Sequence, residues 1–173
     1  MTAPGEGPIG EGPIGEGSVG DTQAELRTWY SNEIWGHKLE DDDLLFEVMC
    51  LQVFQAGLTW RMVLGRRDAF RRAFHGWQIH RVAAMGTDSV ERLLADPSII
   101  RNRRKIEACV ANAGIIQRIQ ADHGSFCRWF YHDLETDDLG ELQKWLRGTF
   151  RFVGPEIARM WLMAAGRIET AAH

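Results

Sequence analysis

Gln52 carries an amide side chain within a mostly apolar stretch of the sequence, between residues 44 and 60. On a helix, where successive residues turn by about 100°, the apolar side chains gather around Gln52 on one face. A buried amide without a partner destabilises a protein by roughly 1–3 kcal/mol, so Gln52 needs a hydrogen bond. Its partner is either a neighbouring loop of the core or a ligand in a pocket that has Trp60 as one wall.

Four basic residues cluster at positions 101–105, in a short turn and at the start of the helix that follows it. The preceding helix is predicted to stop at Asp96 and Pro97, and the next one to begin close to Asn102. Basic side chains are unfavourable there, because they meet the positive end of the helix dipole. A bound phosphate would offset this, since exposed N–H groups and cations together make an anion site. The alternative is a solvated basic turn without a ligand.

A helix–hairpin–helix arrangement favours the phosphate, because such a hairpin presses its backbone against one DNA strand without reading bases. The residues predicted to contact DNA are Ser98, Ile99, Ile100, Arg101, Asn102, Arg103, Arg104 and Lys105. The net charge of −4 does not favour a nucleic-acid partner, but the distribution of charge matters more than the sum. One basic face on an acidic protein is compatible with DNA binding.

The elements that position these residues are all predicted to be helices, because no segment of useful length alternates with period two. Predicted helices cover residues 22–31, 41–57, 59–74, 79–85, 88–95, 103–121 and 125–131, a segment ending near 148, and residues 155–166, and a loop covers residues 32–40. The central helix has N-cap candidates in Asp41–Asp43 and a stop at Gly57. Thr59 and Thr87 are predicted caps, and Pro155 suits a first turn. We therefore expect an all-α bundle of about eight or nine helices.

The length of 173 residues suits one domain with a sizeable core and is short for two. Residues 1–21 repeat the motif GEGPI, whose Gly and Pro density predicts a flexible tail ahead of a single domain over residues 22–173. No apolar run is long enough to span a membrane, and the N-terminus lacks the regions of a signal peptide. A cytoplasmic protein is expected.

The cysteines and histidines do not predict a metal site. Cys50, Cys109 and Cys127 are odd in number and widely spaced, which is typical of reduced thiols in the core of a cytoplasmic protein. The six histidines show neither HxxxH nor CxxC-linked spacing. We expect neither a metal ion nor another cofactor.

Five blocks of the sequence occur in the order found in one known family. They are YSNEIWG at Tyr30–Gly36, LFEVMCLQVFQAGLTW at Leu45–Trp60, VERLLADPSIIRNRRKIEACVANA at Val90–Ala113, GSF at Gly124–Phe126 and FRFVGPEIARMWLMAAG at Phe150–Gly166. Over about residues 26 to 168 the chain resembles the DNA-3-methyladenine glycosylase I family, which has the helix–hairpin–helix DNA glycosylase fold. The resemblance implies a monomeric enzyme that flips an alkylated purine out of double-stranded DNA. Such an enzyme hydrolyses the N-glycosidic bond without a lyase step.

The resemblance also implies roles for individual residues. Tyr30 and Trp60 match pocket residues that hydrogen-bond to the base and stack on it, and Trp35 matches a tryptophan near the same pocket. An electron-rich indole suits a cationic purine. Leu58 stands where the family inserts an apolar wedge into the DNA stack. Gln52 occupies the position of a family glutamate that faces the base, and no catalytic Asp is assigned.

The chain departs from the family pattern in three places. Gln52 replaces the glutamate, and Gly20 stands about where the family has an early tryptophan. The family's zinc site is absent, since Ser31 and Ala171 replace its histidines and the chain ends at His173 before its last cysteine. The neutral amide leaves open a weakened glycosylase, a glycosylase for a different lesion, or a paralogue that binds damaged DNA without excision. A scaffold that contacts only proteins is a further hypothesis.

Overall fold

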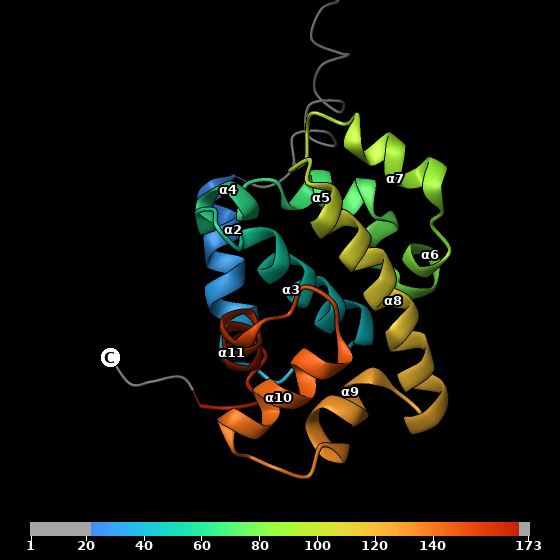
Figure 1. Cartoon of the computed structure of the whole chain (residues 1–173). Coiled ribbons are helices and arrows are strands. Elements are labelled where there is room, and N and C mark those ends of the chain that lie inside the picture. The colour runs from blue at the N-terminus through green and yellow to red at the C-terminus, as the bar shows by residue number, and fades with distance from the viewer. Residues whose placement is uncertain (1–21, 170–173) are drawn as a thin grey trace, which may run out of the picture.

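The computed structural model describes residues 22–169, and these form a bundle of helices without a strand (Figure 1). Its α-helices are α2 (Gln23–Trp29), α3 (Asp42–Gln55), α4 (Trp60–Leu64), α5 (Arg67–Ala73), α6 (Ile79–Ala83), α7 (Thr87–Leu94), α8 (Arg103–His123), α9 (Phe126–Arg128), α10 (Leu139–Thr149) and α11 (Pro155–Ala164). Two π-helical turns, η1 (Tyr30–Ile34) and η3 (Trp129–Asp133), and one 3-10 turn, η2 (His75–Trp77), complete the set. The all-α prediction is confirmed, whereas the predicted tail lies outside the described residues.

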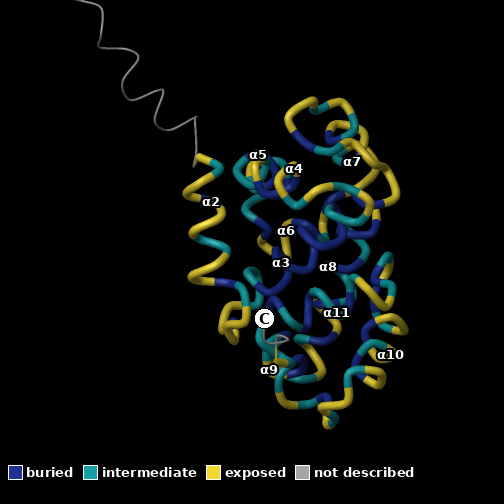
Figure 2. The backbone as a smooth tube through the Cα atoms, turned by 90° about the vertical axis from the view of Figure 1, so that its left-hand side faces the viewer, coloured by how far each residue is buried: buried dark blue, intermediate teal, exposed yellow. Residues whose placement is uncertain are grey.

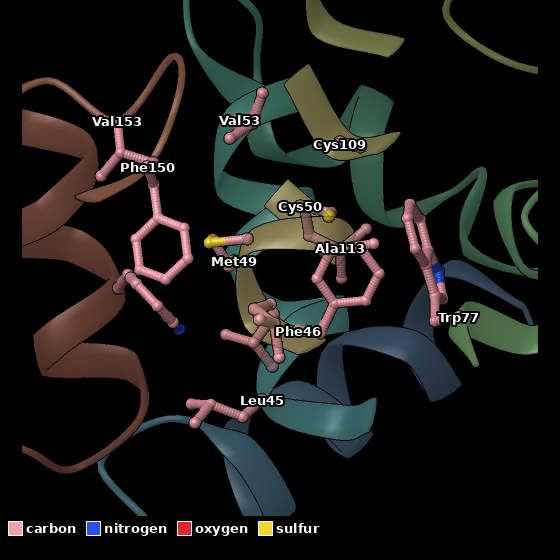
Figure 3. Packing of buried hydrophobic residues seen from close by; sticks show 14 of the residues in the cluster. Leu45, Phe46, Met49, Cys50, Val53, Trp77, Cys109, Ala113, Phe150 and Val153 are labelled. Carbon is pink, nitrogen blue, oxygen red and sulfur yellow. The ribbon is translucent and has the colours of Figure 1, made fainter. Parts of the chain in front are cut away.

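Helix α3 runs through the centre of the bundle, and the other helices surround it (Figure 1). Every residue from position 45 to 54 is buried, as expected for a helix that is apolar almost all the way round. Figure 3 shows Phe46 and Cys50 of this helix among the side chains of Trp77, Cys109 and Ala113. Figure 2 shows the contrast with α2, most of whose backbone is exposed. The buried helix therefore carries Gln52 into the interior.

The ends of α3 follow the predicted local signals. Asp41 is the N-cap, and its Oδ1 accepts hydrogen bonds from the backbone N–H groups of Asp43 at 2.8 Å and Leu44 at 3.3 Å. The helix ends at Gln55, and Gly57 takes a left-handed conformation with φ of 80°. A glycine adopts that conformation without the strain that a Cβ atom would cause.

Three local predictions are wrong. The helix predicted over 59–74 is two helices, because the chain breaks at Gly65, where Gln23 of α2 approaches so closely that a Cβ atom would overlap its amide. Thr87 lies inside α7 and Gly86 occupies the N-cap position. The loop predicted from residue 32 begins only after Ile34, since a π-helical turn continues α2. The first and third differences depend on packing or on an unusual helical turn, which local propensity does not encode.

Hydrogen bonds join the segment before α3 to the end of α11. The Tyr131 hydroxyl donates to the carbonyl oxygen of Ala165 at 2.6 Å and accepts from the Leu39 N–H group at 2.8 Å. The Arg167 guanidinium is buried and donates to three backbone carbonyl oxygens between residues 130 and 136. These contacts join residues 130–136 both to Leu39 and to the residues that follow α11.

The carboxylate of Asp42 holds the start of α9 against α3. It accepts hydrogen bonds at 2.9 Å from the backbone N–H groups of Phe126 and Cys127 and from the side chain of Gln120. Burial acts to raise the pKa of Asp42, but these hydrogen bonds outweigh burial and leave the pKa below its usual value. The ionised carboxylate is therefore favoured in the folded state.

Replacing Asp42 with Asn is expected to lower the free energy of unfolding by about 1–3 kcal/mol near neutral pH, because the amide replaces one accepting oxygen with a donor. The folded-state pKa lies below the unfolded-state pKa, so the stabilisation is present above the unfolded pKa and is lost as pH falls through the folded pKa. Urea denaturation at about pH 7 and about pH 3 measures this. The difference between wild type and Asp42→Asn should shrink at the lower pH, and a constant difference would contradict the assignment.

Candidate active site

Tyr30, Gln52 and Trp60 come from three different elements and meet at one place. The Gln52 amide nitrogen donates to the Tyr30 hydroxyl at 3.1 Å, and the rings of Tyr30 and Trp60 lie 4.7 Å apart between centroids. The Trp35 ring lies 6.1 Å from that of Tyr30. Gln52 is buried, whereas the three aromatic side chains are half-buried. The structure therefore brings together the four residues that the sequence predicted to surround a base.

The Tyr30–Gln52 pair retains one donor and one acceptor. The Tyr30 oxygen accepts from Gln52, so its own proton is free, and among the described residues neither that proton nor Gln52 Oε1 has a partner. Burial raises the pKa of Tyr30, and the hydrogen bond from Gln52 lowers it only in part, so the hydroxyl stays neutral. A neutral hydroxyl and an amide oxygen suit the paired acceptor and donor on one edge of a purine.

Gln52 lines a pocket of about 570 Å³ between the C-terminal end of α3 and the N-terminal turn of α11. Its lining residues are Gln52, Gln55, Ala56, Gly57, Gly154, Pro155, Glu156, Ile157 and Met160. The volume is within the range of small-molecule sites, and apolar atoms dominate the lining. A planar base therefore has room beside the Gln52 amide.

Pocket residues from α11 were not predicted from the sequence. Ile157 and Met160 lie about a hundred positions after Gln52, and only packing of α11 against α3 brings them to the same pocket. The local signal was limited to Gly154 and Pro155, which predicted a helix start without indicating what it faces.

The turn between α3 and α4 carries Leu58 and is closed by hydrogen bonds on both sides. The Leu58 N–H group donates to the Gln55 carbonyl oxygen at 2.8 Å, and the Gln55 amide donates back to the Leu58 carbonyl oxygen at 3.0 Å. Thr59 caps α4 through a hydrogen bond from the Met62 N–H group, as predicted. The half-buried Leu58 therefore sits on a fixed turn next to Trp60.

The side chain of Lys105, which the sequence analysis predicted to contact DNA, is buried in the structure. Its ammonium donates to the carbonyl oxygens of Phe54 at 2.8 Å and Ala56 at 2.6 Å, at the C-terminal end of α3. A cation is favoured there by the helix dipole. Lys105 thereby places the start of α8 directly beside the pocket, which Ala56 lines. Ile99 is also buried and belongs to the core rather than to a DNA-facing surface.

The rest of the hairpin between α7 and α8 is exposed or half-buried. Asp96 closes the turn by accepting from the Ser98 N–H group at 2.9 Å and from its hydroxyl at 2.6 Å. Asn102 caps α8 by accepting from the Lys105 N–H group, which confirms the predicted helix start. Arg101 and Arg104 are exposed at this end of the helix.

Arg103 is exposed like its basic neighbours but is already paired. Its guanidinium contacts Glu91 at 2.7 Å and Glu107 at 3.3 Å. Exposed ion pairs of this kind contribute little to stability, so the guanidinium exchanges them readily for another anion.

Of the two positions where the resemblance implied a replaced zinc histidine, Ser31 is described and Ala171 lies outside the described residues. Ser31 carries a hydroxyl where an imidazole would be needed. Within residues 22–169, no group of three or more His, Cys, Asp or Glu side chains is placed to hold a metal. Cys50 and Cys109 are free and buried, and Cys127 is free and half-buried.

Comparison with known proteins places this geometry in a family context. A family model described as methyladenine glycosylase matches residues 21–144. DNA-3-methyladenine glycosylase 1 of Escherichia coli (strain K12) is 44% identical over 92 residues, which cover 53% of this chain and 49% of that protein. DNA-3-methyladenine glycosylase of Haemophilus influenzae is 38% identical over 84 residues, covering 49% of this chain and 45% of that protein. The chain thus spans about half the length of the curated relatives it matches.

A solved structure agrees over a longer stretch. The structure described as the basis of 3-methyladenine recognition by 3-methyladenine DNA glycosylase I from Staphylococcus aureus superposes with a TM-score of 0.74 at 29% identity. The match covers 86% of this chain and 88% of that one. The structural match therefore covers more of this chain than residues 21–144, which the family model matches.

Proposed function

Because the chain belongs to the methyladenine glycosylase family, we propose that it is a monofunctional DNA glycosylase that excises alkylated purines of the 3-methyladenine type by base flipping. The observation that carries this proposal is the place of the pocket. Gln52 lines the pocket and donates to Tyr30, whose ring packs on Trp60, and Lys105 holds the start of α8 at Ala56, another residue of the lining. A flipped base needs both a slot and a nearby grip on the DNA strand.

The proposed roles follow from the chemistry of each side chain. Trp60 stacks on the flipped base, where an indole face attracts a positively charged purine. Tyr30 and Gln52 offer a donor and an acceptor to the edge of the base. Leu58, on its closed turn, fills the space that the flipped base leaves in the duplex. Trp35 completes the aromatic wall around Tyr30.

Bond cleavage in this proposal depends on the substrate more than on a protein nucleophile. An alkylated purine carries positive charge before its N-glycosidic bond breaks, so it is already a good leaving group. Holding it flat between hydrogen bonds and an indole stabilises the departing base and lets water complete the hydrolysis. No lysine is among the residues that line the pocket, which supports hydrolysis without a lyase step.

Mass spectrometry of released bases tests the proposed function. DNA treated with a methylating agent is incubated with the full chain, and free 3-methyladenine above a no-enzyme control is the expected result. Untreated DNA is the second control. Absence of every alkylated base from the supernatant would reject glycosylase activity.

A second candidate is a paralogue that binds damaged DNA without excising a base. The observation favouring it is that Gln52, a neutral side chain, stands at the position of the family glutamate. Its amide nitrogen donates a hydrogen bond to the Tyr30 hydroxyl. In that case the protein would retard methylated duplex in a gel-shift assay and release no base. Binding together with base release would exclude this candidate.

The hairpin is expected to bind the DNA backbone through Arg101 and Arg104. Replacing both with Ala should weaken duplex binding equally for all sequences and reduce the slope of log K against log salt by about 2, or roughly 0.9 per phosphate contact. Fluorescence anisotropy at several salt concentrations measures both quantities. Arg118→Ala, at the exposed far end of α8, is the matched control. An unchanged slope in the double variant would remove the hairpin from the DNA interface.

The proposed partner is double-stranded DNA containing alkylated bases, bound by a monomer. With DNA as the substrate, the cytoplasm is the proposed location. No cofactor takes part in the proposed reaction. Across residues 22–169 no helix is both long and apolar enough to cross a membrane.

A further inference from the structure

Glu156 is the charged residue among those that line the pocket. It stands at the second position of α11, in the wall formed by that helix, whereas Gln52 belongs to the wall formed by α3. Every other lining residue is an amide, a glycine, a proline or an apolar side chain. The formal charge of the described pocket is therefore that of one carboxylate.

The Glu156 carboxylate is oriented by Arg159, one turn further along α11. Arg159 Nη2 donates to Oε1 at 2.6 Å and its Nε to Oε2 at 3.1 Å. The same guanidinium lies 3.3 Å from the sulfur of Met163, and Arg159 is not among the lining residues. The Arg159 hydrogen bonds lower the pKa of Glu156, so it is ionised at neutral pH. Each carboxylate oxygen still has a lone pair for a ligand.

The groups at the other edge of the pocket cannot distinguish a cationic purine from a neutral one by charge. Gln52 is neutral there, and so is Tyr30, to which Gln52 donates its hydrogen bond. Their hydrogen bonds fit the edge of either purine, because alkylation at a ring nitrogen leaves other donors and acceptors in place. Discrimination by charge needs an anion near the base, since opposite charges at close range attract even in water.

We propose that Glu156 is a specificity-determining residue, whose carboxylate selects cationic purines in the pocket that Gln52 lines. The inference rests on the proposed function only in taking the pocket as the base site. Glu156 is mostly exposed, so its effect on affinity is set by solvent-screened attraction and falls with added salt. Arg159 competes with the base for the same carboxylate, so it should restrain the selectivity.

Binding of two small analogues tests the inference without requiring catalysis. The probes are 3,9-dimethyladeninium, a permanent cation, and 9-methyladenine, its neutral counterpart, titrated calorimetrically into the full chain at low salt. Wild type should prefer the cation, and Glu156→Gln should reduce that preference by about threefold to tenfold without changing affinity for the neutral probe. Arg159→Gln should increase the preference, because the competing cation is gone.

Glu107→Gln is the matched control, since Glu107 is also an exposed glutamate paired with an arginine but does not line this pocket. It should leave the preference unchanged. Equal binding of the two probes to wild type, binding of neither, or an unaltered preference in Glu156→Gln would each overturn the inference. A charge preference without base release would instead reject the proposed glycosylase activity and leave the role of Glu156 standing.

Discussion

Replacing Gln52 with Glu is expected to raise the rate of 3-methyladenine excision by about tenfold to a hundredfold. A hydrogen bond to a charged partner is stronger than a neutral one by about 1–2 kcal/mol, and a carboxylate also attracts the positive charge that passes from the base to the sugar as the N-glycosidic bond breaks. The Tyr30 hydroxyl, already 3.1 Å from the amide nitrogen, would turn its proton toward the new carboxylate. Single-turnover excision from methylated duplex measures the gain.

The matched control for Gln52→Glu is Gln55→Glu, which adds the same charge to another residue that lines the pocket from α3. It should have a smaller effect, because Gln55 is held by the Leu58 carbonyl oxygen instead of by Tyr30. Equal rates for wild type and Gln52→Glu would show that charge at this position does not limit the reaction. If wild type releases no base and Gln52→Glu does, the fold supports excision and the neutral side chain at position 52 is what prevents it.

Replacing Trp60 with Ala is expected to lower excision of 3-methyladenine by about tenfold to a hundredfold. Stacking of one base on an aromatic ring contributes about 1–3 kcal/mol, and a cationic base adds an attraction to the indole face. Trp60 also packs on Tyr30, with ring centroids 4.7 Å apart, so the hydroxyl loses part of its support. Trp60→Phe should recover part of the rate, because it restores a smaller aromatic face.

Trp145→Ala is the control for Trp60→Ala, because Trp145 is a tryptophan of α10 with 56% of its surface exposed. It should release 3-methyladenine at the wild-type rate. Far-UV circular dichroism and the unfolding midpoint establish that both variants fold. Undiminished base release from a folded Trp60→Ala variant would place the base elsewhere.

The central helix and the start of α8 were predictable from the chain alone, because their signals are local. Asp41 and Asn102 cap their helices as their residue types favour. The long apolar stretch around Gln52 required burial on all sides, which identified α3 as the helix at the centre of the bundle. The prediction of an unbroken helix over 59–74 failed at Gly65, where Gln23 of α2 lies so close that a Cβ atom would overlap its amide.

The composition of the pocket was decided by tertiary structure. The family resemblance implied that Tyr30, Gln52 and Trp60 share a pocket, but not that Gln52 Nε2 would donate to Tyr30 while Oε1 has no partner among the described residues. Glu156 faces the pocket because α11 packs against α3 across about a hundred residues of intervening chain. The burial of Lys105 also depends on helix packing, since its ammonium donates to carbonyl oxygens at the C-terminal end of α3. Helix periodicity and capping act within a few residues, whereas these contacts depend on how separate helices approach one another.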